Sequence, residues 1–483
     1  MYLRIQKNRK PIFRRVSLKC LLALFLGLVG HALVAQSYPA EKFGAKANTA
    51  VNNAKALQKA IDVCHHNGGG TVVLSKGTYL SGTLQLKSNV NIEITPSSKL
   101  KGIADSTAYQ PIQSSVISRM DVVPWKAFIH ADSQKNISIY GGGTIDGSGD
   151  APCFADGIEN SPNRPYGIHM INCENIVVRD LHLRSSAFWM QRYFNCRNLK
   201  IQNLDVYNHA NKNNDGIDID SSEDVIITGC TIDSSDDALT IKSEGEHPAK
   251  NIVVTNCIVA SHASAIKLGT GSVGGYENVV ISDIVVRRST SKKMLHPLKV
   301  WEGLTGIDLL TSDGGPMRQV SVSNITIEDV ENPIHVRLGN RLSGNVARQG
   351  YQGNGDELQG VKNKGAGATI TNEPVLEDVT LSNIKCYNVG PYPVIIAGYK
   401  DHPVTRVTLR DITVVLGKKG NQKDLETPPN WKADGYPGRG MYGTRLPAYG
   451  LVTYYTKDLV IENFRAIPKE GEPRPMELHI QRL

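Results

Sequence analysis

A short strand-like pattern recurs along most of this 483-residue chain and constrains its fold more than any other feature. Each copy is a β-branched run, usually opened by Asn or Asp, and in the middle of the chain the copies follow at about 23 to 27 residues, a solenoid spacing. The copies are 136-NISIY, 175-NIVVR, 198-NLKIQ, 224-DVIIT, 251-NIVVT, 278-NVVIS, 319-QVSVS, 378-DVTLS, 406-RVTLR and 458-DLVIE. Most runs alternate apolar and polar residues, as a strand buried on one face does. Because one such turn cannot bury its apolar face alone, the pattern predicts stacked turns around a shared core.

Two solenoid classes share this period. Leucine-rich repeats would show regularly spaced leucines and helical segments, and the repeats here have neither. Asn, Asp, Ser and Gly between the runs instead favour tight corners in an all-β chain. The sequence therefore predicts a right-handed parallel β-helix. Since a solenoid grows by adding turns, residues 38–483 are expected to form one domain, with loop insertions at about 339–377 and 417–450.

The segment 54–70, ahead of the repeats, has a helical period instead. Its apolar residues fall on one face, and three glycines end the pattern. The face consists of Ala54, Leu57, Ala60, Ile61 and Cys64. We expect this helix to cap the open apolar end of the solenoid.

The first 37 residues read as a secretory leader. Seven basic residues and no acid precede an apolar stretch from Leu21 to Ala35, followed by a small-residue exit. The basic residues are Arg4, Lys7, Arg9, Lys10, Arg14, Arg15 and Lys19. The apolar stretch is short for a membrane span, and without the leader the formal net charge falls from +8 to about +1. We therefore expect a secreted or periplasmic protein, with no membrane span and no nucleic-acid partner.

Seven cysteines follow the leader, an odd number. Cys173 and Cys196 share one position of the repeat, and Cys230 and Cys257 share another. Such phasing predicts small apolar residues stacked in the core as free thiols, with one or two disulfide bridges as the alternative. No cysteine–histidine spacing resembles a zinc site.

Three aspartates carry the strongest chemical signal. Asp215 lies in 213-NNDGIDID-220, and Asp236 and Asp237 lie in 234-SSDDALTIKS-243, in consecutive copies of the repeat. Stacked turns would bring the three carboxylates close together, at roughly 5 Å per turn. Such a cluster costs energy through repulsion and separates the pKa values, so we expect a catalytic role rather than corner capping. Asp218 and Asp220 alternate with isoleucines, and we expect them on a solvated face.

Several stretches resemble a known family. The openings 42-KFGAKANTAVNNAKALQKAID-62 and 68-GGGTVVLSKGTYLSGTLQLKSNVNIEI-94, together with 141-GGGTIDGSG-149, are similar to family 28 of the glycoside hydrolases, the polygalacturonase-type enzymes that degrade pectin. Its Asn-x-Asp motif matches 213-NND-215, and its double aspartate matches Asp236 and Asp237. The resemblance covers nearly the whole chain after the leader. It implies a parallel β-helix enzyme that hydrolyses glycosidic bonds.

The resemblance also assigns roles. Asp236 would be the general acid, while Asp215 and Asp237 would share the general base role, without a cofactor or metal. Carboxylates one or two turns apart would suit the wide spacing of an inverting enzyme. Asn213 would orient Asp215 or bind sugar. Lys242 would meet a substrate carboxylate or lie on the surface.

The sequence departs from the family pattern in two places. The family's Gly-His-Gly motif is replaced in 261-SHASAIKLGT-270, so His262 is displaced from the expected position, which falls on Ala263 or Ser264. A one-residue shift reverses the face of a strand residue, which leaves His262 a candidate helper in substrate binding.

The second departure removes two cations. The Arg-x-Lys motif that binds the galacturonate carboxylate in the family aligns with Asp308 and Leu310. Either other cations replace it, or the sugar in that subsite is neutral. The candidate replacements are Lys267, Arg337 and Arg341.

The second insertion contains four aromatic residues, Trp431, Tyr436, Tyr442 and Tyr449. They are predicted to stack on sugar faces, and loops closing one end of the site would favour an exo-acting enzyme. A disordered excursion is the alternative. We expect a monomer with a polysaccharide or oligosaccharide substrate. A calcium-dependent polysaccharide lyase and a non-catalytic carbohydrate-binding solenoid remain the competing functions.

Overall fold

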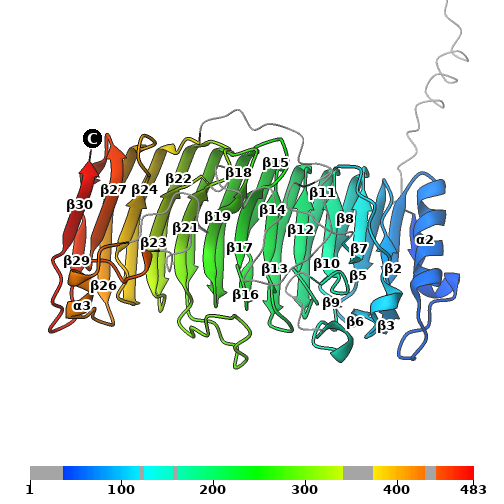
Figure 1. The fold of residues 1–483 in the computed structure, drawn as a ribbon. Coiled ribbons are helices and arrows are strands. Elements are labelled where there is room, and N and C mark those ends of the chain that lie inside the picture. Colours follow the sequence, from blue (N-terminus) through cyan, green and yellow to red (C-terminus); the bar gives the residue numbers. More distant parts are fainter. Residues whose placement is uncertain are drawn as a thin grey trace, which may run out of the picture. The chain divides into compact units, whose positions relative to one another are not determined.

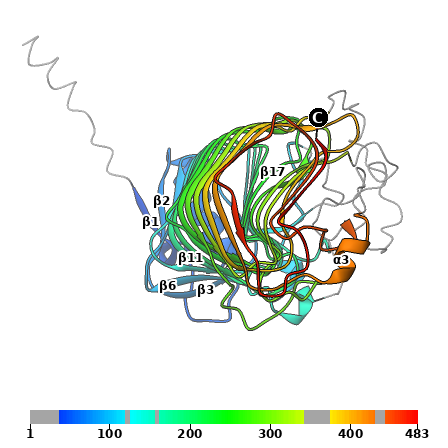
Figure 2. The ribbon, with the colours of Figure 1, turned by 90° about the vertical axis from the view of Figure 1, so that its left-hand side faces the viewer.

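The computed structural model describes residues 36–116, 118, 125–155, 161–340, 374–429 and 442–482. From Ser37 onward these residues form one compact unit, a solenoid of parallel strands. Apart from Gln36 and Ser37, the predicted leader lies outside the described residues. Figure 1 shows successive turns stacked in chain order, and Figure 2 looks along the stack onto the superposed turns. The predicted right-handed parallel β-helix is confirmed.

Three parallel sheets run along the solenoid, and every strand pairs with strands one turn away. The first sheet contains β1 (Ser37–Pro39), β2 (Gly70–Leu74), β5 (Val90–Ile94), β8 (Lys135–Tyr140), β15 (Glu223–Thr228), β28 (Val460–Glu462) and the first parts of seven long strands. These long strands are β11 (Glu174–Arg184), β13 (Arg197–Asn208), β18 (Ala249–Ser261), β20 (Tyr276–Val286), β22 (Met317–Glu328), β24 (Glu377–Val389) and β26 (Val404–Leu416).

The second sheet begins where each long strand bends. It contains β3 (Gly77–Ser81), β6 (Ser98–Gly102), β9 (Thr144–Asp146), β16 (Thr231–Ser234), β29 (Arg465–Ile467) and the second parts of the long strands. The third sheet contains β4 (Leu84–Gln85), β7 (Ala127–Asp132), β10 (Tyr166–Ile171), β12 (Gln191–Phe194), β14 (Ile217–Asp220), β17 (Leu239–Ser243), β19 (Ser264–Ser272), β21 (Thr305–Thr311), β23 (Asn332–Leu338), β25 (Val394–Ala397), β27 (Leu451–Lys457) and β30 (Glu477–Arg482).

The Asn and Asp residues that open the repeats form the corners. Asn175, Asn198 and Asn251 all have left-handed backbones, with φ between 54° and 58°, a conformation that Asn tolerates better than other side chains with a Cβ. Their amides also bond along the stack, from Asn198 Nδ2 to Asn175 Oδ1 at 2.7 Å and from Asn251 Nδ2 to Asp224 Oδ1 at 2.9 Å. One residue type thus sets both the turn and the spacing of the turns.

A continuous apolar core fills the solenoid. In the third sheet, alternate residues such as Ile217, Ile219, Leu239 and Ile241 point inward and are fully buried. Cysteines 64, 173, 196, 230, 257 and 386 are buried free thiols, and Cys153 is an exposed one. The prediction of core free thiols is therefore confirmed for the four phased cysteines, and the disulfide alternative is wrong because all seven described cysteines are free.

The predicted helix is α2 (Ala54–His66), which packs at the first turn of the solenoid (Figure 1). Leu57, Ala60, Ile61 and Cys64 are buried against the core, while Ala54 is only partly covered. The other helices are short: η1 (Ala40–Phe43), η2 (Ser106–Ala108), η3 (Pro152–Phe154) and α3 (Gln422–Glu426). Within the described residues, none of the helices has the length and apolar character needed to span a bilayer.

The predicted insertions are described only in part. Residues 341–373 of the first, including the candidate Arg341, lie outside the described residues, as do Trp431 and Tyr436 of the second. In the second insertion Tyr442 is fully buried against β25 and β27, and Tyr449 is partly exposed. The prediction that Tyr442 offers an open ring for stacking is therefore wrong in this arrangement.

Candidate active site

The three aspartates lie in the turns that lead into the third sheet. Asp215 precedes β14 by two residues, and Asp236 and Asp237 precede β17. The register pairs Ile217 with Leu239, which places Asp215 beside Asp237 in the next turn. One carboxylate oxygen from each of Asp215, Asp236 and Asp237 lies within 4.8 Å of the others. The three carboxylates therefore lie together, as the spacing of the repeats predicts.

This cluster is tighter than expected. The three oxygens lie closer than the spacing of about 6.5–9.5 Å between carboxyl groups that accompanies inversion. The expected wide separation is therefore not observed between these atoms, and distance alone does not support inversion. The three carboxylates could also hold a cation, because each offers one oxygen to a common point.

Asn214, which the sequence analysis missed, anchors the turn that carries Asp215. Its amide donates to the carbonyl oxygens of Ser186 and Phe188 at 2.9 and 2.8 Å and accepts from the backbone N–H of Ala210 at 2.7 Å. The Asn208 amide donates to the Asp215 carbonyl oxygen at 2.9 Å. Asn213 is partly exposed and accepts a hydrogen bond from Arg164. The residue that fixes the Asp215 turn is thus Asn214, and Asn213 stays a candidate for sugar binding.

The environments of the carboxyls differ. Burial, followed by the charge of Asp218, raises the pKa of Asp215 well above its usual range. Burial, followed by the charge of Asp237, also raises the pKa of Asp236, which is the only partly exposed member of the three. Both groups are therefore pushed toward the protonated form in the absence of substrate.

Asp237 shows the opposite behaviour. Burial opposes its ionisation, but the charges of Lys267 and Lys242 outweigh burial and lower its pKa. Lys267 Nζ lies 2.6 Å from Asp237 Oδ2, and the backbone N–H of Ser264 donates to Oδ1 at 3.2 Å. The predicted substrate cation Lys267 is thus engaged by a carboxylate of the protein. The cluster therefore contains one acid that favours its ionised form, Asp237, and two that favour their protonated forms, Asp215 and Asp236.

Lys242 is the second cation of the cluster. It is buried, and its Nζ lies 3.6 Å from Asp218 Oδ1 and 4.6 Å from the ring centroid of Trp189. Although burial opposes its charge, Asp218 and Asp215 raise its pKa. The surface alternative for Lys242 is wrong, because loops and aromatic rings cover the outer face of the sheet here.

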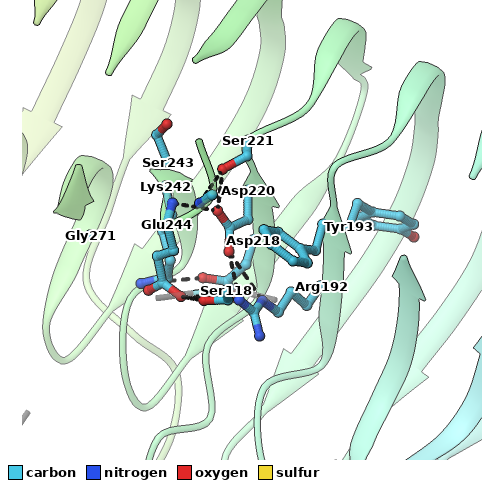
Figure 3. A network of polar contacts seen from close by, with 12 residues as sticks. Ser118, Arg192, Tyr193, Asp218, Asp220, Ser221, Lys242, Ser243, Glu244 and Gly271 are labelled. Atoms are coloured by element: carbon cyan, nitrogen blue, oxygen red, sulfur yellow. Dashed lines mark hydrogen bonds and ion pairs between the residues drawn. The ribbon is translucent and has the colours of Figure 1, made fainter. Parts of the chain in front are cut away.

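Asp218 and Asp220 are fully buried, so their predicted solvated position is wrong. Arg192 Nη2 contacts Asp220 Oδ2 at 2.7 Å and Glu244 Oε2 at 3.0 Å, and Ser118 Oγ donates to the same Glu244 oxygen (Figure 3). Within the described residues, neither oxygen of Asp218 accepts a hydrogen bond. The alternation of residues along the strand correctly predicts that both aspartate side chains point away from the core. It does not predict which side chains cover the outer face of the sheet.

An aromatic cluster covers the third sheet on the N-terminal side of the aspartates. Trp125 stacks on Phe188 with ring centroids 4.9 Å apart, and Phe188 stacks on Trp189 at 5.4 Å. The register places Trp189 beside Asp215, one turn earlier. Trp189 therefore forms the wall of the site on this side.

His262 is fully buried, and its backbone N–H donates to the carbonyl oxygen of Ser234, two residues before Asp236. Its ring packs edge-on against His209 at 5.1 Å and Trp301 at 5.7 Å, and burial lowers its pKa to about 4. In the described part of the chain, neither ring nitrogen has a hydrogen-bond partner. The structure gives His262 no contact surface for substrate.

Asp308 and Leu310 occupy the expected position of the missing cations. The register aligns Asp308 with Lys267, and the Asp308 carboxylate accepts from Ser264 Oγ and contacts His335 Nδ1 at 3.1 Å. Arg337 is the register neighbour of Leu310, but it is fully buried, with its guanidinium 5.8 Å from the Tyr442 ring centroid. Arg337 was a candidate cation for the substrate, but in this arrangement it presents no exposed surface to a sugar.

Comparison with known proteins places this architecture in a family. The profile of Glycosyl hydrolases family 28 matches residues 64–350, more than half of the chain. The chain therefore belongs to glycosyl hydrolase family 28, and the predicted family is confirmed.

The curated relatives that the chain is similar to include polygalacturonases and exopolygalacturonases. A polygalacturonase of Gossypium barbadense is 28% identical over 41% of this chain and 47% of its own length. An exopolygalacturonase of Zea mays is 25% identical over 80% of this chain and 85% of its own. The chain thus spans about half the length of the first curated relatives that it matches.

Two solved structures share the fold. The family 28 exopolygalacturonase of Yersinia enterocolitica has a TM-score of 0.65 at 17% identity, covering 93% of this chain and 77% of its own. A hyperthermoactive exopolygalacturonase of Thermotoga maritima has a TM-score of 0.61 at 19% identity, covering 88% and 92%.

Proposed function

We propose that this protein hydrolyses glycosidic bonds of a pectin-type polysaccharide or oligosaccharide. The observation that carries the proposal is the divided cluster, in which Lys267 holds Asp237 ionised while burial favours protonated Asp236. Hydrolysis needs this pairing of a proton donor with a proton acceptor across one bond. The leader pattern supports export of the enzyme, and we expect it to act as a monomer.

In this mechanism Asp236 donates its proton to the glycosidic oxygen as the bond to the anomeric carbon breaks. Asp237 accepts a proton from the water that forms the new bond to that carbon, and Asp215 helps to hold the water. Both oxygens of Asp237 already accept hydrogen bonds, from Ser264 N–H and Lys267, and Asp215 favours its protonated form. Neither group is therefore suited to form a covalent glycosyl ester, and we propose single displacement with inversion.

We propose that the enzyme acts at a chain end. The cluster of Trp125, Phe188 and Trp189 packs on the outer face next to the aspartates, where it would stop a bound chain from continuing over the preceding turns. End-acting hydrolysis releases one small product from the start of the reaction, whereas internal cleavage gives a ladder of sizes.

We also propose a neutral sugar in the subsite beside Asp308. A uronate placed there would meet a carboxylate rather than the two cations of the family motif. Supporting this, nearby Lys267 is paired with Asp237, and Arg337 is buried.

The test is hydrolysis of a panel of pectic oligosaccharides that contain either uronates alone or uronates with neutral sugars. We expect new reducing ends, one small early product, and higher kcat/KM for the mixed oligosaccharides. Lack of turnover on every member of the panel would contradict the proposal.

Two buried lysines beside three carboxylates also suit the competing lyase function better than the sequence suggested, because a lyase needs a base and a cation site. A lyase would give a product that absorbs in the ultraviolet and would lose activity with a chelator. A purely binding solenoid would bind these oligosaccharides without releasing products. We expect chelator-resistant hydrolysis and no ultraviolet-absorbing product.

A further inference from the structure

The segment between β20 and β21 combines positive charge with an exposed aromatic ring. Residues 287–301, RRSTSKKMLHPLKVW, are named here the basic loop. They contain five Lys and Arg residues, and no acid occurs between Asp283 and Glu302. The cations are Arg287, Arg288, Lys292, Lys293 and Lys299.

The start of the basic loop is fixed beside the general-acid turn. Ser289 Oγ donates to Asp233 Oδ1 at 2.6 Å, and the backbone N–H and hydroxyl of Thr290 both donate to Asp233 Oδ2 at 2.8 Å. Asp233 belongs to β16 and precedes Asp236 by three residues. The loop therefore leaves the solenoid next to the catalytic turn.

The end of the loop returns to the same place. The Trp301 ring packs edge-on against the buried His262, and the backbone N–H of Leu304 donates to the Ala263 carbonyl oxygen at 2.9 Å. The register places Ala263 one turn beyond Asp236. Within the loop, His296 lies close enough for its charge to lower the pKa of Asp236, against the larger effects of burial and Asp237.

Most of the charge on this loop is available to a ligand. Within the described residues, the exposed side chains of Arg288, Lys292 and Lys299 form no ion pair, and Lys293 reaches the exposed Asp150 only at 3.8 Å. Trp301 exposes 40% of its surface while one edge is held by His262. An indole fixed in this way, beside lysines, offers a stacking surface for a sugar and partners for its carboxylates.

We propose that the basic loop is a binding arm for uronate-bearing units of the substrate, with Trp301 as its sugar-stacking platform. The inference rests on the proposed function. It assigns recognition of neutral and acidic sugars of the substrate to two separate parts of the protein. The subsite beside Asp308 excludes a carboxylate, and the arm attracts the carboxylates of neighbouring units. The arm therefore selects glycans that carry both neutral and acidic sugars.

The test is equilibrium binding of an unbranched galacturonate oligosaccharide by calorimetry at low salt. The variant Lys292→Gln/Lys293→Gln/Lys299→Gln should weaken binding by about ten-fold, since it removes three exposed charges that each contribute modestly. The difference should fall steeply as salt is raised. The control variant Lys42→Gln/Lys55→Gln/Lys59→Gln removes three exposed charges near the capping helix and should bind like the wild type.

Specificity for sugar is tested with Trp301→Ala, which should weaken binding of the galacturonate oligosaccharide but not of polyglutamate of matched charge. Unfolding temperatures within about 2 °C of the wild type show that the variants remain folded. The inference would be overturned if the wild-type protein did not bind the oligosaccharide, or if the triple lysine variant bound it as tightly as the wild type. It would also be overturned if Trp301→Ala weakened binding of polyglutamate as much as binding of the oligosaccharide. Failure of the proposed function is separate, because it appears as absent hydrolysis by wild-type protein.

Discussion

Replacing Lys267 by methionine removes the charge that holds Asp237 ionised while keeping most of the side-chain volume. The Lys267 Nζ to Asp237 Oδ2 distance is 2.6 Å, and both side chains are only 7% exposed, so solvent screens this pair little. Breaking a buried ion pair from one side costs about 3–5 kcal/mol. An opposite charge at such a distance favours the ionised aspartate and lowers its pKa. We therefore expect Lys267→Met to move the acid limb of the kcat/KM profile to higher pH.

The stability of the same variant should depend on pH in a defined direction. The folded pKa of Asp237 is lowered, so the pair stabilises the protein above the unfolded aspartate pKa of about 3.9 and loses its effect as pH falls through the folded value. The deficit of Lys267→Met in denaturant unfolding should be largest near pH 7 and smallest in acid. Lys267→Arg should restore most of both effects, and Lys250→Met, at an exposed pair with Glu277, should change stability by less than about 1 kcal/mol. If the acid limb of the kcat/KM profile were the same in Lys267→Met and the wild type, the claim that the charge of Lys267 keeps Asp237 ionised would be refuted.

Three further outcomes follow from the site. Arg192→Met leaves Asp220 and Glu244 without their buried partner and should cost about 3–5 kcal/mol in denaturant unfolding; a loss below about 1 kcal/mol would contradict the buried network. Asp308→Asn removes a like charge and should raise kcat/KM for an all-uronate oligosaccharide by about five-fold or more, with little change for a mixed one, while equal changes would argue against a neutral subsite. Proton NMR of the first product should show the inverted anomer, and the retained anomer would exclude single displacement.

The sequence was sufficient for the solenoid because its corners are local. Asn175 and Asn198 adopt the left-handed corner conformation that their side chains tolerate, and the same spacing phases the aspartates into neighbouring turns. Asp215 and Asp237 could therefore be brought together from repeat counting alone. The repeat period, the corner residues and the apolar alternation each depend only on residues within one turn or in the next turn. They can therefore be recognised directly from the order of residues in the sequence.

The surroundings of the aspartates depend on contacts that repeat counting does not describe. Asp218 was expected in solvent, but Trp189 and Glu244 from adjacent turns and Ser118 from a distant loop cover that face. Lys267 was identified as a cation near the site, yet only the side-chain geometry shows that it pairs with Asp237. The sequence gives no sign of the role of Asn214. That role depends on hydrogen bonds to the backbone carbonyl oxygens of Ser186 and Phe188, which only the folded structure reveals.

The most direct test of the proposed mechanism is the rate of hydrolysis by Asp236→Asn. This substitution keeps the size of the side chain and removes the proton that the leaving oxygen needs. With a pectic oligosaccharide that the wild type hydrolyses, we expect kcat to fall by about 10²–10⁴-fold while the Kd for the same oligosaccharide changes little. Hydrolysis at the wild-type rate by Asp236→Asn would contradict the assignment of the general acid and with it the proposed mechanism.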